Sequence, residues 1–278
     1  MDLKDIVVHV DSTVASDIRL KVALSLAARF EAQLTGLHVI PDPEVPPYFK
    51  PSVVEKIAGI YEEHAREAAK VASLHFNRAT QDSGIAVIWR CVEGNIARLL
   101  AEHARFADLL ILGQADTENP PNMRAFPLPH DVVMNAGTPV LAIPVQTAVR
   151  EVGRRVLLAW DGSREATRAF RDAMPLLLAA DQIFLIAIDP SHQGHVRIGA
   201  LVPYMVEHLA RHNIHVEVAT VRSGAENTID LLLSHASQIG ADLIVMGAFG
   251  HLRLKEFIIG GTTYDLLNRT TISVLMSH

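Results

Sequence analysis

The sequence predicts an α/β protein made of two tandem, doubly wound parallel-sheet domains. The first observation is an internal repeat: KDIVVHVD at 4–11 matches RRVLLAWD at 154–161, and ADLLILG at 107–113 matches ADLIVMG at 241–247. The second is that short apolar segments alternate with amphipathic ones, which is typical of βαβ units. The third is a composition with 49% hydrophobic but only 5% aromatic residues, which suits parallel sheets covered by helices on both faces.

A further repeated block closes each half of the chain. GTPVLAIPV at 137–145 aligns with TTISVLMSH at 270–278. Because the blocks follow the same order twice, we predict two homologous domains, an N-terminal half at 1–148 and a C-terminal half at 149–278. The polar segment QTAVREVG at 146–153 is the predicted linker.

Each half is expected to contain five strands separated by helices. In 16–30 and 52–79, apolar residues recur about once per helical turn, which places them on one helix face. Pro175 is expected to break or kink the first helix of the C-terminal half, and a shorter second helix is expected at about 197–212. The predicted strands are 5–10, 34–40, 85–92, 108–113 and 139–143 in the N-terminal half, and 155–160, 183–188, 214–221, 242–247 and 272–276 in the C-terminal half.

The composition argues against several classes of protein. No run of about 18 apolar residues is present, so no transmembrane helix is expected. The N-terminus lacks the pattern of a signal peptide, and the single cysteine, Cys91, cannot form an internal disulfide, so we expect a cytoplasmic protein. A net charge of −6 without a long basic run argues against a nucleic-acid partner.

A ligand site is expected where the parallel strands end. Open α/β sheets bind ligands beyond the carboxyl ends of their strands, at the point where the strand order reverses. In the C-terminal half this edge carries Asp161, Asp189 and Gly247, each at or just after the end of a predicted strand.

The stretch GAFGHLRLKEFIIGGTT at 247–263 is the strongest candidate for binding a phosphate. Gly247 and Gly250 allow close approach of the backbone to a ligand, and Gly260 and Gly261 precede a predicted helix at 262–269. The first amides of a helix have no partner within it and favour anions. The stretch matches neither the Rossmann GxGxxG nor the GxxxxGK[ST] pattern.

These residues resemble the universal stress protein family, and two copies in one chain resemble its tandem form. The resemblance rests on the strand that ends in Asp, the ADLIVMG block and the G-x2-G-x9-G motif followed by small residues. It implies a five-stranded parallel sheet of order 3-2-1-4-5 in each domain, as in adenine nucleotide alpha hydrolase-like folds. It also implies binding of ATP, with or without Mg²⁺, or of another adenine nucleotide, and a regulatory or stress-response role.

The resemblance also implies which residues touch the nucleotide. The motif glycines, with Gly261 or the hydroxyl of Thr262, would hold the phosphates, Asp161 would lie beside the adenosine, and the backbone near Ile188 would face the base. The predicted nucleotide-binding residues are Asp161, Ile188, Met246, Gly247, Gly250, Gly260, Gly261 and Thr262. No catalytic residue is predicted, and any hydrolysis would be that of a slow ATPase.

The two halves depart from this pattern to different degrees. In the C-terminal half, Gly261 stands where a hydroxyl residue is expected. In the N-terminal half only the first glycine, Gly113, survives, and the other motif positions read Asp116, Phe126 and Pro127. An acidic charge, a bulky ring and a missing amide oppose phosphate binding, so we predict that only the C-terminal half binds nucleotide.

Five alternatives to this interpretation are considered. The glycines could form an empty turn, and Asp161 could be the N-cap of a helix that starts near Arg164. The chain could be a protein-interaction module of the same fold without a nucleotide. An adenylating enzyme is disfavoured, because the loop after the first strand reads DGSREA rather than SGGxD. Histidines at 192–215 invite a metal, but no cysteine or carboxylate cluster accompanies them, so no metal site is predicted.

The last strand of each half is expected at the edge of its sheet. In the family that the chain resembles, such strands pair across a pseudo-two-fold axis. The strands at 139–143 and 272–276 are therefore expected to pair within the chain as a built-in dimer, and association of two chains as a homodimer is a further possibility.

Overall fold

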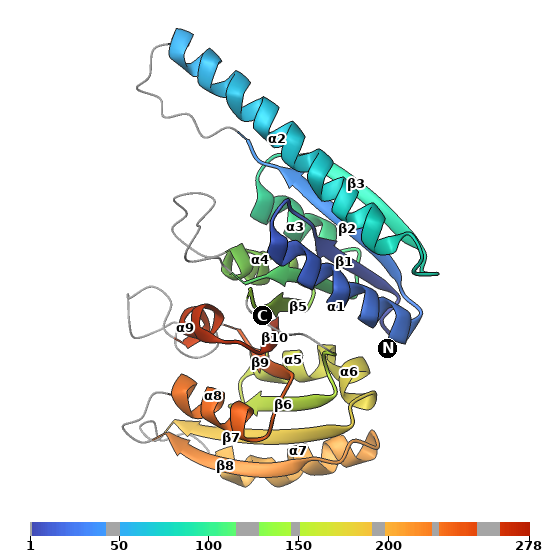
Figure 1. Ribbon diagram of the computed structural model, residues 1–278. Helices are drawn as coiled ribbons and strands as arrows, with labels where there is room; N and C mark the ends of the chain where they lie inside the picture. The colour runs from blue at the N-terminus through green and yellow to red at the C-terminus, as the bar shows by residue number, and fades with distance from the viewer. Residues whose placement is uncertain are drawn as a thin grey trace.

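The computed structural model confirms the predicted architecture (Figure 1). It describes residues 2–42, 51–114, 128–145, 151–190, 198–223, 228–248 and 262–278. In the N-terminal half the elements are β1 (Asp5–His9), α1 (Val14–Phe30), β2 (Gln33–Ile40), α2 (Pro51–Thr80), β3 (Val87–Glu93), α3 (Ile96–Ala104), β4 (Leu109–Gly113), α4 (Leu128–Ala136) and β5 (Val140–Ile143).

The C-terminal half repeats this order of strands and helices. Its elements are β6 (Arg155–Trp160), α5 (Arg164–Asp172), α6 (Met174–Leu178), β7 (Gln182–Pro190), α7 (Ile198–Arg211), β8 (Glu217–Ser223), α8 (Thr228–Gln238), β9 (Leu243–Gly247), α9 (Thr262–Arg269) and β10 (Ser273–Ser277).

The described strands form one ten-stranded sheet in the order β3-β2-β1-β4-β5-β10-β9-β6-β7-β8. Each half contributes five strands in the order 3-2-1-4-5, and within each half every described pair is parallel. At the centre, β5 and β10 pair antiparallel, with Leu141 opposite Leu275. In the structure this pair joins the two five-stranded sheets edge to edge, and α4 and α9 lie side by side across the junction.

Two apolar cores lie on opposite faces of the sheet. Neighbouring residues along β6 alternate between them: Val156 and Leu158 pack in the core beneath α1, α2 and the α5–α7 region, whereas Leu157 and Ala159 pack beneath the α3, α4, α8 and α9 side. The central strands are buried on both faces, which explains why they read as continuous apolar runs.

The helix break at Pro175 is confirmed. The helix α5 ends at Asp172, and α6 begins at Met174 with Pro175 in its first turn, where the missing amide costs no hydrogen bond. The largest error in the start of a predicted strand is at β8, which begins at Glu217 and not at residue 214, while β3 begins at Val87 and not at residue 85. Ile214 N donates instead to Leu209 O at 3.0 Å, so this residue still belongs to the turn that closes α7.

The Asp of each ADLLILG-type block has a structural role at the opposite edge of the sheet. Asp242 accepts hydrogen bonds from the backbone N–H groups of Gly153 at 2.7 Å and Arg155 at 2.9 Å. Asp108 does the same for Lys4 at 2.7 Å and Asp5 at 3.0 Å. Each carboxylate thus fixes the start of the first strand of its half.

Candidate functional site

The candidate site lies where β6 and β9 end. Asp161 follows β6 and is exposed, and its Oδ1 accepts a hydrogen bond from Ser163 N at 2.9 Å. Gly162 between them has a φ of +76°, a conformation that favours glycine. Within the described ranges, Oδ2 of Asp161 has no hydrogen-bond partner. This oxygen is therefore available to a ligand.

The N-cap of α5 is Ser163, not Asp161. The helix begins at Arg164, as expected, and Ser163 Oγ accepts a hydrogen bond from Ala166 N at 3.1 Å. The alternative in which Asp161 caps the helix was therefore wrong. The reason is spacing: Asp161 reaches only the amide two residues on, which closes a turn before the helix starts.

Gly247 ends β9 against the first turn of α5. A Cβ at this position would lie 2.3 Å from Ala166 N and 2.5 Å from the carbonyl carbon of Glu165. Both are backbone atoms, which cannot move aside as a flexible side chain could. Close packing of helix on strand therefore accounts for this glycine, a role that the sequence analysis missed.

The sheet brings several of the predicted site residues to one edge. β6 lies between β7 and β9, and Trp160, the residue before Asp161, is opposite Ala187, the residue before Ile188. Met246 and Gly247 are half-buried and pair with β10. Thr262 is the first residue of α9. The structure describes Ile188 and Thr262 in backbone only, and Gly250, Gly260 and Gly261 lie outside the described residues.

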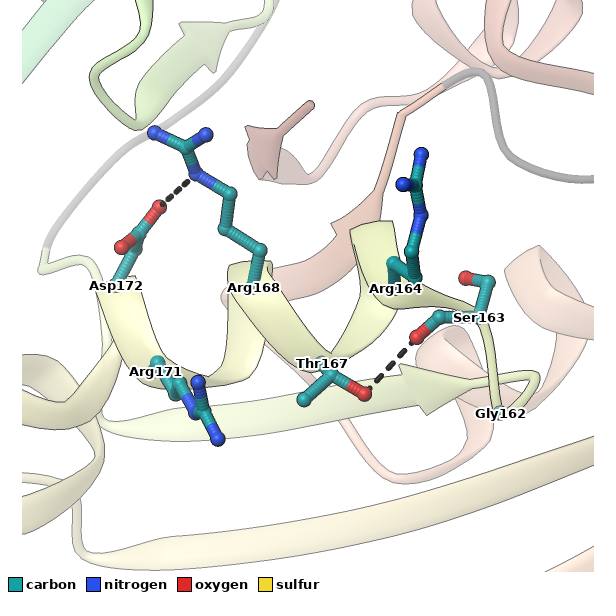
Figure 2. Close-up of a pocket in the computed structure, with 7 residues that line it drawn as sticks. All are labelled: Gly162, Ser163, Arg164, Thr167, Arg168, Arg171 and Asp172. Atoms are coloured by element: carbon teal, nitrogen blue, oxygen red, sulfur yellow. Dashed lines mark hydrogen bonds and ion pairs between the residues drawn. The ribbon is translucent and has the colours of Figure 1, made fainter.

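A basic groove of about 560 Å³ runs along α5 from this edge, as Figure 2 shows. Arg168 Nε lies 3.5 Å from Asp172 Oδ2, and its guanidinium also donates to Gly137 O in the N-terminal half. The Arg164 side chain is 94% exposed. The described lining consists of Gly162, Ser163, Arg164, Thr167, Arg168, Arg171 and Asp172.

This groove is not among the predicted sites, although the sequence contains a pattern that indicates it. The segment SREATRAFRD places arginines at positions 164, 168 and 171, a spacing that brings them to one helix face. Such a face attracts anionic groups near the carboxyl edge of β6.

The histidines that suggested a metal are only partly described. His208 and His212 lie on α7 and the turn after it, with ring centroids 5.0 Å apart, and His208 also meets the ring of Phe170 edge-on. His192 and His195 lie outside the described residues. In the part of the chain that is described, His, Cys, Asp and Glu form no group of three or more that could hold a metal ion.

Of the four motif positions in the N-terminal half, the structure describes the surviving glycine, Gly113, where β4 ends. Asp116, Phe126 and Pro127 lie outside the described ranges.

Cys91 is exposed on β3, and partial burial together with Glu93 raises the pKa of its thiol. Across the described helices, none combines the length and the apolar character needed to cross a membrane.

The comparisons with known proteins agree with this architecture. The sequence profile of the universal stress protein family matches twice, at residues 3–144 and 153–278. A universal stress protein from Synechocystis sp., Slr1230, is 26% identical over 153 residues, which span 52% of this chain and 48% of that protein, so the match covers about half of the relative's length.

Solved structures show the same fold. A universal stress protein from Archaeoglobus fulgidus superposes with a TM-score of 0.73 at 18% identity, over 99% of this chain and 96% of that one. A protein of unknown function from Pseudomonas aeruginosa gives a TM-score of 0.59 at 17% identity, over 99% and 92% of the two chains. With two matches of the family profile that together span nearly all of the sequence, the chain belongs to the universal stress protein family, in its tandem form.

Proposed function

We propose that the C-terminal half binds ATP or another adenine nucleotide, and that the protein acts as a regulator in a stress response. The observation that carries this proposal is Asp161, an exposed carboxylate at the junction of β6 and β9 with one oxygen unused among the described residues. It stands at the edge of the sheet where α/β proteins bind ligands.

In this proposal the nucleotide spans the carboxyl edge of the C-terminal half. Asp161 accepts a hydrogen bond from the ribose, and the backbone near Ile188 faces the base. The phosphates lie against Gly250, Gly260 and Gly261 and the start of α9, where unpaired amides and the helix dipole favour anions. In this proposal Thr262 would offer a hydroxyl, and Mg²⁺ would neutralise phosphate charge.

The arginine groove supports an anionic ligand at this edge. Arg164 follows the cap of α5 directly and pairs with Glu165 at 3.3 Å, and its side chain is almost fully exposed, so a phosphate that extends from the site can reach its guanidinium. No residue is proposed as a catalytic base, and turnover would be that of a slow ATPase at most.

We further propose that the halves at 1–148 and 149–278 act as unequal domains of one cytoplasmic protein. The N-terminal half would lack a nucleotide, and the β5–β10 pair would hold the halves together as a built-in dimer. Association of two whole chains as a homodimer is part of the same proposal. The mass of the protein in solution tests this part, because it distinguishes a single chain from a pair of chains.

The test is the stoichiometry of binding to the intact chain. A fluorescent ATP analogue is expected to bind one equivalent per chain, and Gly250→Val is expected to abolish binding because the motif loop no longer accepts a phosphate. Gly59→Val is the matched control, since a Cβ at Gly59 on α2 meets nothing within 4 Å. Gly247→Val is not suitable, because its clash with α5 would disturb the fold itself.

A result against the proposal would be full retention of binding by Gly250→Val, or two equivalents bound per chain. Mass spectrometry of the supernatant after denaturing the freshly purified protein gives an independent check, because a tightly bound nucleotide would be released there.

A second candidate function is a protein-interaction module without nucleotide. The specific observation in its favour is Gly247, whose contact with α5 explains a glycine at this position without any ligand. In that case the groove formed by Arg164, Arg168 and Arg171 would be the surface for an acidic partner. Neither co-purified nor added nucleotide would then be found on the protein.

A further inference from the structure

The carboxyl edge of the N-terminal half contains a buried arginine. Arg19 projects from α1, and its side chain is only 6% exposed. Its Nη2 lies 2.6 Å from Asp11 Oδ2, and its Nε donates to the backbone oxygen of His9, the last residue of β1, at 3.2 Å. The guanidinium is thus held by the end of the strand and by the carboxylate that follows it.

The same guanidinium covers the end of β4. A Cβ on Gly113 would lie 2.1 Å from Arg19 Nη1 and 3.2 Å from its Cζ. The strand β1 pairs with β4 on one side and with β2 on the other, so the arginine sits where the strand order reverses. This is the crevice in which an open α/β sheet binds its ligands.

The carboxylate in this crevice is fully used. Oδ1 of Asp11 accepts hydrogen bonds from both the N–H and the hydroxyl of Thr13, and Oδ2 accepts from Arg19. Burial by itself raises the pKa of Asp11, but the charges of Arg19 and His9 and the bonds from Thr13 outweigh it and lower the pKa to about 2. The ion pair therefore persists throughout the neutral range of pH.

The C-terminal half is built differently at the equivalent positions. At the offset of 150 that aligns Asp11 with Asp161, Arg19 corresponds to Ala169, a buried residue of α5. Asp161 makes the same turn through Ser163 N, yet among the described residues it has no ion pair. The two halves thus share a carboxylate and a turn but differ in whether an arginine covers them.

We propose that Arg19 is a built-in occupant of the ligand crevice in the N-terminal half. Its guanidinium takes the place that a ligand would take between Asp11 and Gly113, whereas no described arginine pairs with Asp161 in the C-terminal half. The inference holds whether or not the C-terminal half binds nucleotide, because it rests on contacts within the N-terminal half. It adds a reason for a closed first site that is independent of the lost glycine motif.

The test is chemical rescue of the vacated crevice in the full-length chain. Arg19→Ala removes the occupant and leaves Asp11, so low-millimolar guanidinium chloride is expected to raise the Tm of this variant relative to equal sodium chloride. The wild type, whose crevice is filled, is expected to show no rise. The double variant Arg19→Ala with Asp11→Asn is expected to show none either, because the anchoring charge is gone. Arg66→Ala, which removes an exposed ion pair on α2, is the control for a surface arginine.

A folded Arg19→Ala variant whose Tm responds equally to guanidinium and to sodium would overturn the proposal. Should that variant fail to fold, the wild type provides the decision through NMR titration of its carboxylates. An Asp11 that titrates well below ordinary aspartates supports the buried pair, whereas one that titrates at the ordinary value contradicts it.

Discussion

The carboxyl edges of the two halves are built from the same elements, but they differ in whether the carboxylate after the first strand is covered. Asp11 and Asp161 each follow the first strand of their half and each accept the amide two residues on, at 2.9 Å in both cases. In the N-terminal half a guanidinium covers the carboxylate, whereas in the C-terminal half the carboxylate is exposed. A duplicated fold therefore does not imply a duplicated site, because a side chain on the neighbouring helix covers the carboxylate in the N-terminal half and none on α5 does so in the C-terminal half.

The two glycines at the strand ends show the same divergence. Gly247 packs against backbone atoms of α5, and Gly113 packs against the end of the Arg19 side chain. Backbone cannot retreat without unwinding the helix, whereas an arginine can change its rotamer. The same residue type is thus rigidly required in one half and more loosely required in the other.

The largest effect is expected from Gly247→Ala. The added methyl group would overlap Ala166 N, so we expect a loss of about 3 kcal/mol or more in the free energy of unfolding, measured by urea denaturation. Gly113→Ala is expected to cost less, since the Arg19 side chain can shift. Gly59→Ala, in open space on α2, is the control and is expected to be neutral or slightly stabilising. Equal losses at Gly247 and Gly113 would remove this distinction between the halves.

The next largest loss of stability is expected at the start of the first strand of each half, where an Asp side chain accepts backbone hydrogen bonds in both halves. Asp242→Ala leaves the N–H groups of Gly153, Arg154 and Arg155 without their carboxylate, and we expect a loss of roughly 2 to 3 kcal/mol in unfolding experiments. Asp108→Ala, which frees two N–H groups, is expected to cost less. A larger loss at Asp108 than at Asp242 would show that the number of bonds does not set the difference.

Replacement of Arg19, which covers the carboxylate of Asp11, is expected to destabilise the N-terminal half alone. The pKa of Asp11 falls from 3.8 to about 2 on folding, which corresponds to about 2 kcal/mol of stabilisation. Arg19 shares in this shift with His9 and Thr13, so Arg19→Gln is expected to lose up to about that amount at neutral pH. Arg66→Gln provides the comparison at an exposed pair, where a smaller loss is expected. Both are measured by urea denaturation, and equal losses would contradict a special role for Arg19.

The ionisation of Asp11 is also expected to make the free energy of unfolding depend on pH. Because folding lowers the pKa of Asp11, its contribution is complete above about pH 4 and disappears as the pH falls towards about 2. The difference in unfolding free energy between the wild type and Asp11→Asn should therefore shrink over this window. A difference that stays constant from neutral pH to about pH 2 would show that the charge of Asp11 does not matter.

The smallest effect on stability is expected from Asp161→Asn. The carboxylate is exposed, and its one described hydrogen bond can be made by an amide oxygen, so we expect a change within about 0.5 kcal/mol. Affinity for an ATP analogue is expected to fall in the same variant. A large loss of stability would place Asp161 with Asp11 as a structural residue and weaken the contrast between the halves.

Most of the fold could be predicted from the sequence. Ten apolar runs, two periodic helices and three repeated blocks were sufficient for two parallel α/β domains, because buried parallel strands and their crossover helices leave strong local patterns. The strand order came instead from the resemblance to the universal stress protein family. The helix break at Pro175 has an equally local cause. The error at the start of β8 arose where a turn that closes α7 interrupts an apolar run.

The candidate site was less predictable, because its character depends on contacts between distant segments. Asp161 and Gly247 could be selected from their place after apolar strands. The cap at Ser163, the packing of Gly247 on α5 and the arginine groove depend on how α5 lies against the sheet.

The sequence by itself determined that the chain has two similar α/β halves and that a carboxylate follows the first strand of each. These features are set by local periodicity and by repetition along the chain. Only the tertiary structure decided that Arg19, eight residues beyond Asp11, turns back to fill the crevice between β1 and β4, whereas Asp161 stays exposed. The physical reason is that an ion pair depends on where two side chains meet in space. The spacing of residues along a helix does not determine which residues of other elements lie next to them.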